Sequence, residues 1–316
     1  MVWQAVNPHE AANVGSARTR RLLVDLTRDF SIEVTPKTLA KQADISGLFP
    51  QHTRVYIACL PGEPWQDVVS AAERVRANGL IPVPHVAARS LIDQADLDAY
   101  VTALARQAKV DQVLVVGGGT DRPVGQFSGT LALLETGILE GHGIRAIGLA
   151  GHPEGHRELP EPAIAATLED KWGYDDKTNA SCRLVTQFLF DAAPLIAWER
   201  ALRAAGNPLP IHVGIPGPAT IKTLLNYAKM CGVGNSMRVL TRRGGSLLRL
   251  AGLSFPDRLL TALAHHQEED SATRIERLHF YPFGGIGRTA HWINAVREGR
   301  FDMHQDGQGF TVDPVV

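Results

Sequence analysis

The sequence contains few cysteines and no long hydrophobic run. Its three cysteines, Cys59, Cys182 and Cys231, are too few and too scattered for a disulfide framework or a CxxC metal site. We expect each of them to be a small buried residue in a reducing compartment. No segment approaches the roughly 20 apolar residues that a transmembrane helix needs, and no apolar stretch follows the N-terminal charges. The sequence therefore predicts a cytoplasmic protein without a membrane span.

An excess of charge of one sign is also lacking. The 32 Lys and Arg residues nearly balance the 33 Asp and Glu residues, so no overall field attracts nucleic acid or an anionic membrane. With 44% hydrophobic and 21% charged residues, the composition is that of a packed protein and excludes a disordered chain. Because no linker, repeat or low-complexity tract is present, we predict one domain over residues 1–316, with residues 1–30 as an N-terminal extension. A homo-oligomer is compatible with the sequence.

Short β-rich runs alternate with longer segments of helical periodicity. This alternation is typical of parallel strands joined by helices, and the almost continuously apolar runs indicate a sheet covered on both faces. The predicted fold class is α/β, a (β/α)8 TIM barrel with a short N-terminal helical extension and an extra helix before the last strand, around residues 259–265. The predicted strands are residues 31–34, 54–60, 80–86, 112–118, 144–151, 182–190, 211–217 and 277–283. The main predicted helices are residues 65–78, 94–108, 130–139, 195–205 and 219–230.

In barrels of this type the reactive groups lie at the carboxyl ends of the strands. Glu33 lies there inside an apolar run, where desolvation should raise its pKa toward the value that a general acid needs. The alternative is an inward-pointing Glu33 that pairs with an arginine for structural reasons. The run Gly117-Gly118-Gly119 could bind a phosphate or a pterin edge through its N–H groups, or form a tight turn without a ligand.

Histidines gather on the same rim, namely His85, His152 and His156. We predict no metal site, because no HxH pair lies in the first strand and no carboxylate cluster joins the histidines. Hydrogen bonds to ribityl or phosphate oxygens of a cofactor suit them better.

Gln187 lies between apolar residues, so its amide needs both a donor and an acceptor as partners. A heterocycle with an amide-like edge would supply both, as would a polar layer inside the barrel. Phe188 and Tyr227 could stack on a ligand or simply pack.

Several short motifs, in this order, resemble the methylenetetrahydrofolate reductase family of flavin-bearing (β/α)8 barrels. The family's S-[FI]-E and P-H patterns appear at residues 31–33 and 84–85, and its P-E-x-H pattern appears at residues 153–156. The most specific motif, T-Q-F-x-F-D, spans residues 186–191 and is followed by I-P-G at 215–217 and H-F-Y at 279–281. The resemblance extends from about residue 31 to about residue 296.

The resemblance implies a role for each matching position. Glu33 would be the general acid that helps to open the methylene bridge of the folate. The flavin site would comprise Cys59, His85, Gly118, Gly119, Thr120, Asp121, His152, Glu154, His156 and Lys171. Reduced folate would contact Gln187, Phe188, Tyr227 and Arg288, whose guanidinium suits the carboxylates of the glutamate tail. FAD would be the cofactor and NAD(P)H the co-substrate.

The sequence departs from the family pattern where the flavin is expected. The fourth-strand R-G-D is replaced by residues 118–121, Gly-Gly-Thr-Asp, and the basic N-L-K-R-K segment by residues 168–172, which leave only Lys171. His152 replaces an aromatic residue, and the last-strand loop at residues 282–288 is rich in glycine. Two of these changes remove positive charge, and a hydrogen bond to a charged group contributes about 1.5–3 kcal/mol.

The predicted reaction is the reduction of 5,10-methylenetetrahydrofolate to 5-methyltetrahydrofolate, or its reverse, with FAD carrying the hydride. Within the family the alternative is direct hydride transfer from NAD(P)H without flavin. From another class the alternative is a pterin-dependent one-carbon transferase without redox chemistry.

Overall fold

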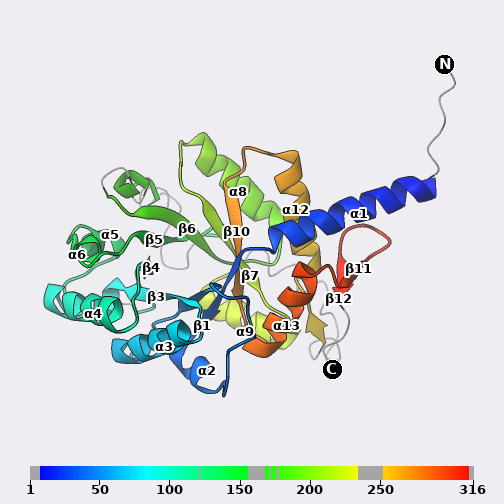
Figure 1. Cartoon of the computed structure of the whole chain (residues 1–316). Helices are drawn as coiled ribbons and strands as arrows, with labels where there is room; N and C mark the ends of the chain where they lie inside the picture. The colour runs from blue at the N-terminus through cyan, green and yellow to red at the C-terminus, as the bar shows by residue number, and fades with distance from the viewer. Residues whose placement is uncertain are drawn as a thin grey trace.

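The computed structural model describes residues 8–120, 122–155, 168–170, 172–175, 178–233 and 252–312. Eight parallel strands close into a barrel in the order β1-β10-β7-β6-β5-β4-β3-β2, and helices surround it (Figure 1). The predicted (β/α)8 TIM barrel is therefore confirmed. The barrel strands are β1 (Phe30–Val34), β2 (Arg54–Ile57), β3 (Ile81–Ala87), β4 (Gln112–Val116), β5 (Ala146–Gly151), β6 (Ser181–Phe188), β7 (Ile211–Pro216) and β10 (Ile275–Tyr281).

The helices predicted at residues 65–78, 94–108, 195–205 and 219–230 are confirmed, whereas α2, η1 and α13 were not predicted. The described helices are α1 (Pro8–Leu26), α2 (Pro36–Ala40), α3 (Trp65–Ala77), the 3-10 turn η1 (Ala88–Ser90), α4 (Gln94–Gln107), α5 (Thr130–Leu134), α6 (Ile138–Gly141), α8 (Ala192–Ala204), α9 (Ile221–Cys231), α12 (Asp257–Glu269) and α13 (Ile286–Arg297). The single helix predicted at residues 130–139 is wrong. It divides into α5 and α6 because Gly137 adopts a left-handed φ of 67°, which ends the first helix.

Two small antiparallel ribbons were not predicted from the sequence. β8 (Ala219–Thr220) pairs with β9 (Leu253–Ser254), and β11 (Phe301–Met303) pairs with β12 (Phe310–Val312). Strands this short carry too few residues for an alternating pattern to distinguish them from loops.

The N-terminal helix and the extra helix before the last strand are both present. α1 packs along α12, where Thr19 Oγ1 lies 3.0 Å from His265 Nε2, and Leu23 is completely buried. The amino-terminal part of α1 projects beyond the barrel (Figure 1). α12 follows α9 in the described chain and leads directly into β10, so it is the extra helix that the sequence predicts.

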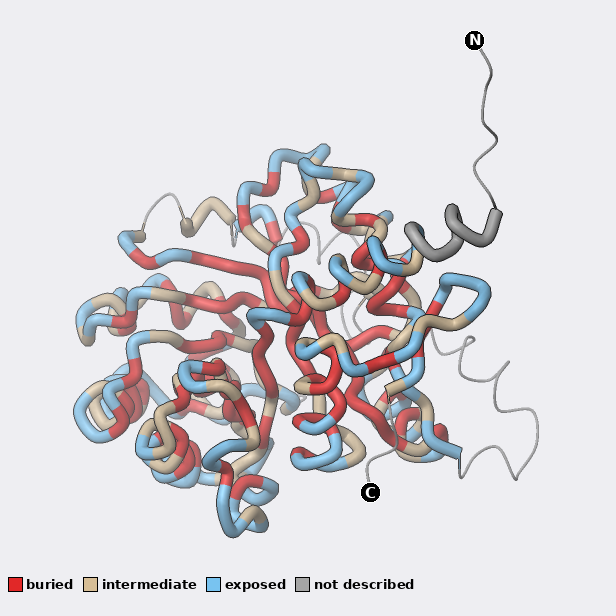
Figure 2. The backbone as a smooth tube through the Cα atoms, turned by 45° about the vertical axis from the view of Figure 1, so that its right-hand side comes forward, coloured by how far each residue is buried: buried red, intermediate tan, exposed pale blue. Residues whose placement is uncertain are grey.

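Two of the apolar clusters among the described residues build the barrel wall and the barrel interior. The larger cluster fills the space between the barrel strands and the outer helices, and a smaller one of Tyr56, Val83, Leu114 and Val185 joins four strands across the interior. Buried segments accordingly follow the strands, and the exposed faces belong to the helices (Figure 2). Arg183, only 7% exposed, donates from Nε to Tyr56 Oη at 3.1 Å, so the interior also contains a polar layer.

A β-bulge interrupts β6 close to its carboxyl end. The register between β6 and β7 shifts between Val185 and Phe188, which leaves Thr186 and Gln187 outside the ladder with β7. Thr186 Oγ1 accepts from the Gly214 N–H at 2.8 Å, and a side chain at Gly214 would meet the Gln187 carbonyl at 2.7 Å. Bulges of this kind redirect a side chain next to a functional site.

The structure tests two expectations, one about membrane-spanning helices and one about the cysteines. Among the described residues, no helix has an apolar stretch long enough to cross a membrane. The cysteines are all free thiols, but only Cys182 is buried, whereas Cys59 is half-buried and Cys231 is exposed. The expectation that all three would be buried is therefore wrong for Cys59 and Cys231. Cys231 ends α9 and contacts solvent instead of the core.

Candidate functional site at the barrel mouth

Glu33 lies between two histidines at the carboxyl end of the barrel. Its Oε2 is 3.4 Å from Nε2 of His85 on β3 and 3.5 Å from Nε2 of His279 on β10. His279 is completely buried, and its ring makes an edge contact with Tyr56 at 4.5 Å between centroids. Three separate strands therefore bring one carboxylate and two imidazoles together. The structural alternative, a Glu33 paired with an arginine, is not what the structure shows.

The prediction that Glu33 has a raised pKa is wrong. Burial does favour the protonated form, but contacts with His279 and His85 outweigh it and lower the pKa of Glu33 to about 2. Burial also lowers the pKa of His279, so this imidazole is neutral near pH 7. The group at the mouth is thus a carboxylate flanked by two imidazoles.

Ser31 orients the His279 ring from below. Ser31 Oγ lies 3.0 Å from His279 Nδ1, one inward position deeper on β1 than Glu33. If the Ser31 hydroxyl donates to Nδ1, the proton of the neutral ring is on Nε2 and faces the carboxylate. The Nε2 atoms of His85 and His279 are buried and make no hydrogen bond with good geometry to the described residues. Both atoms could therefore form a hydrogen bond with a ligand at the mouth.

The bulge places Gln187 at the same mouth. Tyr281 follows His279 on the inward face of β10, with ring centroids 4.9 Å apart, and its hydroxyl donates to the Thr186 carbonyl at 3.1 Å. Gln187 Oε1 accepts from the Phe188 N–H at 3.1 Å, which fixes the amide plane. Because all eight strands are parallel, Glu33 and Gln187 share one end of the barrel.

An aromatic cluster lines the side next to Gln187. Phe188 is 1% exposed and makes edge contacts with Phe190, Tyr281 and Phe283, so it takes the packing role that the sequence left open. Tyr227 on α9 is half-buried and stacks on Phe283 with centroids 4.1 Å apart. Half-buried stacked rings present an edge or a face to a planar ligand.

The glycine turn after β4 lies on the opposite side of the mouth. Gly118 has a φ of 99°, which side chains rarely adopt, and a side chain at Gly119 would meet Pro61 at 3.2 Å. Arg89 secures the turn by donating to the Thr120 carbonyl at 3.3 Å and the Ser128 carbonyl at 3.1 Å. The Thr120 hydroxyl is buried and has no hydrogen-bond partner among the described residues. The turn therefore offers a close backbone approach and one unsatisfied hydroxyl to a ligand.

The other predicted site residues are placed less tightly. His152 and Glu154 are half-buried in the turn after β5, where the Gly155 N–H donates to the His152 carbonyl at 3.1 Å. Cys59 follows β2 and packs against the core, and burial raises its pKa. Arg288 is exposed near the start of α13 and donates to the Gly284 carbonyl at 3.2 Å. Asp121, His156 and Lys171 lie outside the described residues.

Sequence reasoning missed two residues of this site, His279 and Phe283. The H-F-Y motif contains His279, but its inward orientation follows only from pairing β10 beside β1. A histidine at the carboxyl end of a strand was the available signal. Phe283 follows β10 by two residues, and its stacking on Tyr227 depends on α9 folding back over the mouth.

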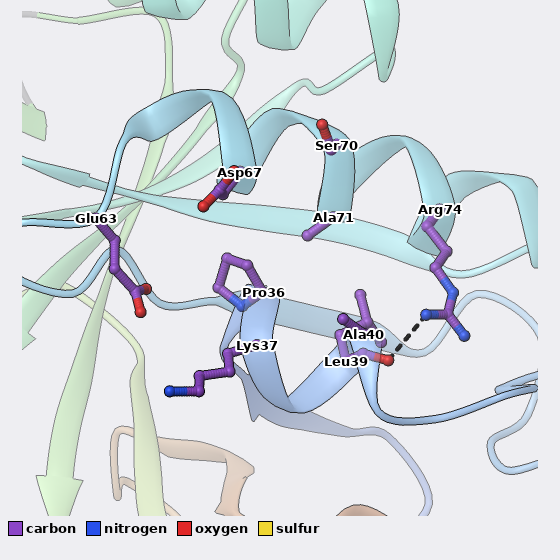
Figure 3. A pocket seen from close by; sticks show the side chains of 9 residues that line it. All are labelled: Pro36, Lys37, Leu39, Ala40, Glu63, Asp67, Ser70, Ala71 and Arg74. Carbon is purple, nitrogen blue, oxygen red and sulfur yellow. Dashed lines mark hydrogen bonds between the residues drawn. The ribbon is translucent and has the colours of Figure 1, made fainter.

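A separate cavity of about 470 Å³ lies outside the barrel wall, between α2 and α3 (Figure 3). Its charged lining residues are Lys37, Glu63, Asp67 and Arg74. Arg74 is held by the Leu39 carbonyl at 2.9 Å. None of the predicted catalytic or binding residues lines this cavity.

Chemically, the mouth combines one carboxylate, two buried imidazoles, one amide and a stacked aromatic pair. A carboxylate can stabilise a positive charge that develops on a bound molecule, and the amide can bind the edge of a heterocycle. The described site residues thus suit a planar, polar ring system.

Comparisons with known proteins find one short sequence match and one shared fold. No family model matches the sequence. Over 85 residues the chain is 36% identical to methylenetetrahydrofolate reductase 2 of Saccharomyces cerevisiae, a stretch that covers 27% of this chain but only 14% of that protein. An uncharacterised protein from Clostridium thermocellum that binds two copies of 5-methyl-5,6,7,8-tetrahydrofolic acid aligns over 89% of this chain and 98% of its own, with a TM-score of 0.52 and 11% identity. That second likeness shows the shared fold.

Proposed function

We propose that the barrel mouth binds a reduced folate and catalyses the NAD(P)H-dependent reduction of 5,10-methylenetetrahydrofolate to 5-methyltetrahydrofolate, or its reverse. The observation that carries this proposal is the ionised Glu33 between His85 and His279, at the same mouth as the Gln187 amide. The short match to a methylenetetrahydrofolate reductase and the barrel shared with a methyltetrahydrofolate-binding protein support the substrate class. A cytoplasmic location remains part of the proposal.

Glu33 would act on the folate's one-carbon unit. Opening the methylene bridge produces an iminium cation, and a carboxylate with a pKa of about 2 stabilises that charge without being neutralised. When the bridge opens, the leaving nitrogen takes up a proton, and solvent water would supply it, because a carboxylate with so low a pKa carries none at neutral pH and the His279 imidazole is neutral. The predicted general-acid role of Glu33 therefore becomes electrostatic stabilisation of the cation.

Gln187 and the aromatic residues would bind the rest of the folate. The pterin ring carries an amide-like edge, and the Gln187 side chain offers both a donor and an acceptor to such an edge. Tyr227 and Phe283 would stack against an aromatic ring of the substrate. These contacts would hold the reactive carbon beside Glu33.

The glycine turn would hold FAD if the hydride reaches the folate through flavin. Gly118, Gly119 and the unsatisfied Thr120 hydroxyl fit the polar edge of such a cofactor. A bound FAD would supply two-electron chemistry, accepting a hydride from NAD(P)H and returning it to the folate. The visible absorption spectrum of the purified protein, with an assay for released flavin, distinguishes this route from direct transfer between nicotinamide and folate.

The test is the Glu33→Gln variant. We expect methylenetetrahydrofolate-dependent oxidation of NAD(P)H to fall about a hundredfold or more, while the Kd for 5-methyltetrahydrofolate changes only a few-fold. Glu63→Gln, a half-buried carboxylate at the outer cavity, is the matched control and should retain full activity. Equal activity of Glu33→Gln and wild type would refute the role of Glu33. A wild-type protein that binds the folate but never oxidises NAD(P)H would favour the transferase alternative.

A further inference from the structure

A second group of ionisable side chains lies away from the mouth, between α8 and α12. Within the described part of the chain, Glu199, His266 and Asp270 each offer one possible ligand atom, and these three atoms lie within 4.8 Å of one another. His266 and Asp270 are four residues apart at the end of α12, so both lie on one helix face. Glu199 faces them from α8.

Two atoms of this group are buried without hydrogen-bond partners. Glu199 is completely buried and His266 is 4% exposed, yet Glu199 Oε2 and His266 Nε2 make no hydrogen bond to any described residue. Leaving a buried acceptor unsatisfied is costly, and more so when it is charged. A buried carboxylate oxygen without a partner among the described residues, beside an imidazole nitrogen in the same state, therefore points to a ligand.

The remaining oxygens of the group are already oriented by other contacts. Glu199 Oε1 accepts from the Arg274 N–H at 2.9 Å and lies 3.2 Å from Arg203 Nε. Asp270 accepts from Arg203 at 2.6 and 3.2 Å and lies 3.7 Å from the exposed Arg200. Such contacts leave lone pairs on each carboxylate and hold it in place, as the outer partners of metal ligands do.

We propose that Glu199, His266 and Asp270 form a zinc site that fastens α8 to α12. One imidazole nitrogen and two carboxylate oxygens are donors that zinc accepts, and a water completes four-coordination. The two carboxylates against Arg203 leave a negative charge for the ion to neutralise, because Arg200 is exposed and screened.

The position of the site indicates a structural role. α12 leads into β10, and Glu199 also holds the Arg274 N–H in the turn before that strand. The site therefore lies at the amino end of the barrel strands, the face that serves stability in this fold. A bound ion would connect α8, α12 and the start of the strand that carries His279.

The experiment uses the full-length, untagged protein after treatment with a chelator. Isothermal titration with ZnCl2 should show saturable binding of one ion per chain, and thermal unfolding should show a rise in Tm when zinc is bound. His266→Ala should weaken this binding at least tenfold. His291→Ala, which removes an exposed histidine on α13, is the control and should bind as wild type does.

A measurement on the wild type covers the case in which His266→Ala fails to fold. The visible spectrum of the Co²⁺-loaded protein should show the intense bands of a four-coordinate site with nitrogen and oxygen ligands. No saturable binding in wild type, equal affinity in a folded His266→Ala, or only the weak bands of a hydrated six-coordinate ion would each overturn the proposal. In that case the ion pairs with Arg203 would be sufficient to stabilise the carboxylates of Glu199 and Asp270 without a metal ion.

Discussion

Histidines have different roles at different depths of this barrel. His85 and His279 lie at the mouth and direct Nε2 toward the Glu33 carboxylate. His212, on β7, is 1% exposed and lies deeper, where its Nε2 is 3.2 Å from Glu276 near the amino end of β10. Burial lowers the pKa of His212 to about 4, and the contact with Glu276 does not compensate. His212 is therefore a neutral donor in the folded protein.

The depressed pKa of His212 makes the fold sensitive to mild acid. The unfolded chain takes up a proton near pH 6.5 and the folded chain only near pH 4, so stability is complete above pH 6.5 and falls as the pH drops toward 4. Between pH 7.5 and pH 5 this difference amounts to about 2 kcal/mol. We predict that the fall in the free energy of unfolding from pH 7.5 to pH 5 is about 2 kcal/mol smaller for His212→Gln than for the wild type. The glutamine side chain retains a donor for Glu276.

The measurement is urea unfolding of both proteins at pH 7.5 and pH 5. Because all other titrating groups are shared, the difference between the two pH-dependent losses isolates His212. Identical losses in the two proteins would show that His212 is not held neutral by burial.

At the residue scale, the sequence predicted which residues lie at the site better than it predicted their protonation states. Glu33 and Gln187 were recognised because each interrupts an apolar strand near its carboxyl end. The sign of the Glu33 pKa shift was wrong because the local sequence shows burial but not the two imidazoles, which come from strands distant along the chain. The Glu199, His266 and Asp270 group had no sequence signal for the same reason, since two helices separated by β7 and α9 contribute to it.

At the element scale, strand identity was predictable and strand irregularity was not. All eight predicted strands exist, because apolar runs of the right length lie between helical segments. The bulge at Thr186 and Gln187 depends on Gly214 in the neighbouring strand, whose missing side chain lets the Gln187 backbone approach. A pattern read along one strand contains no information about its neighbour, so the orientation of Gln187 could not be predicted.

Gly214→Ala tests this dependence. The new Cβ would lie 2.7 Å from the Gln187 carbonyl and the Phe188 nitrogen, so the bulge must shift. We predict a loss of about 1–3 kcal/mol in the free energy of unfolding, the usual cost of overpacking. Because the shift moves Gln187, the affinity for 5-methyltetrahydrofolate should also fall.

Gly287→Ala is the matched control for this substitution. Gly287 is exposed in α13 with open space around the position of its Cβ, so alanine should stabilise the helix by up to about 1 kcal/mol. Urea unfolding and a folate titration of both variants make the comparison. A Gly214→Ala protein with unchanged stability and affinity would contradict the close approach.

At the scale of the whole molecule, the alternation of strands and helices was enough to predict the barrel. The eight parallel strands form a closed barrel, so no strand has a free edge. Connections between parallel strands of one sheet are right-handed in almost all proteins. The arrangement of one domain over the whole chain remains a prediction. The barrel separates its two ends: the carboxyl ends carry Glu33 and Gln187, and the amino ends are covered where α1 meets α12.

This separation predicts that stability and ligand binding can be changed independently. Leu23 is fully buried in α1 just before β1 begins, at the end of the barrel opposite the mouth. Leu23→Ala should lower the free energy of unfolding by about 2–5 kcal/mol, because it leaves a cavity in the core. Its Kd for 5-methyltetrahydrofolate should match that of wild type at a temperature where both are folded.

Two further variants make the test complete. Arg21→Ala changes an exposed residue on the same helix and should leave both stability and affinity unchanged. Gln187→Leu should weaken folate binding at least tenfold, because a buried polar edge of the ligand loses its partner, while stability changes far less than in Leu23→Ala. A folded Leu23→Ala that binds folate tenfold more weakly would show that the two ends of the barrel are coupled.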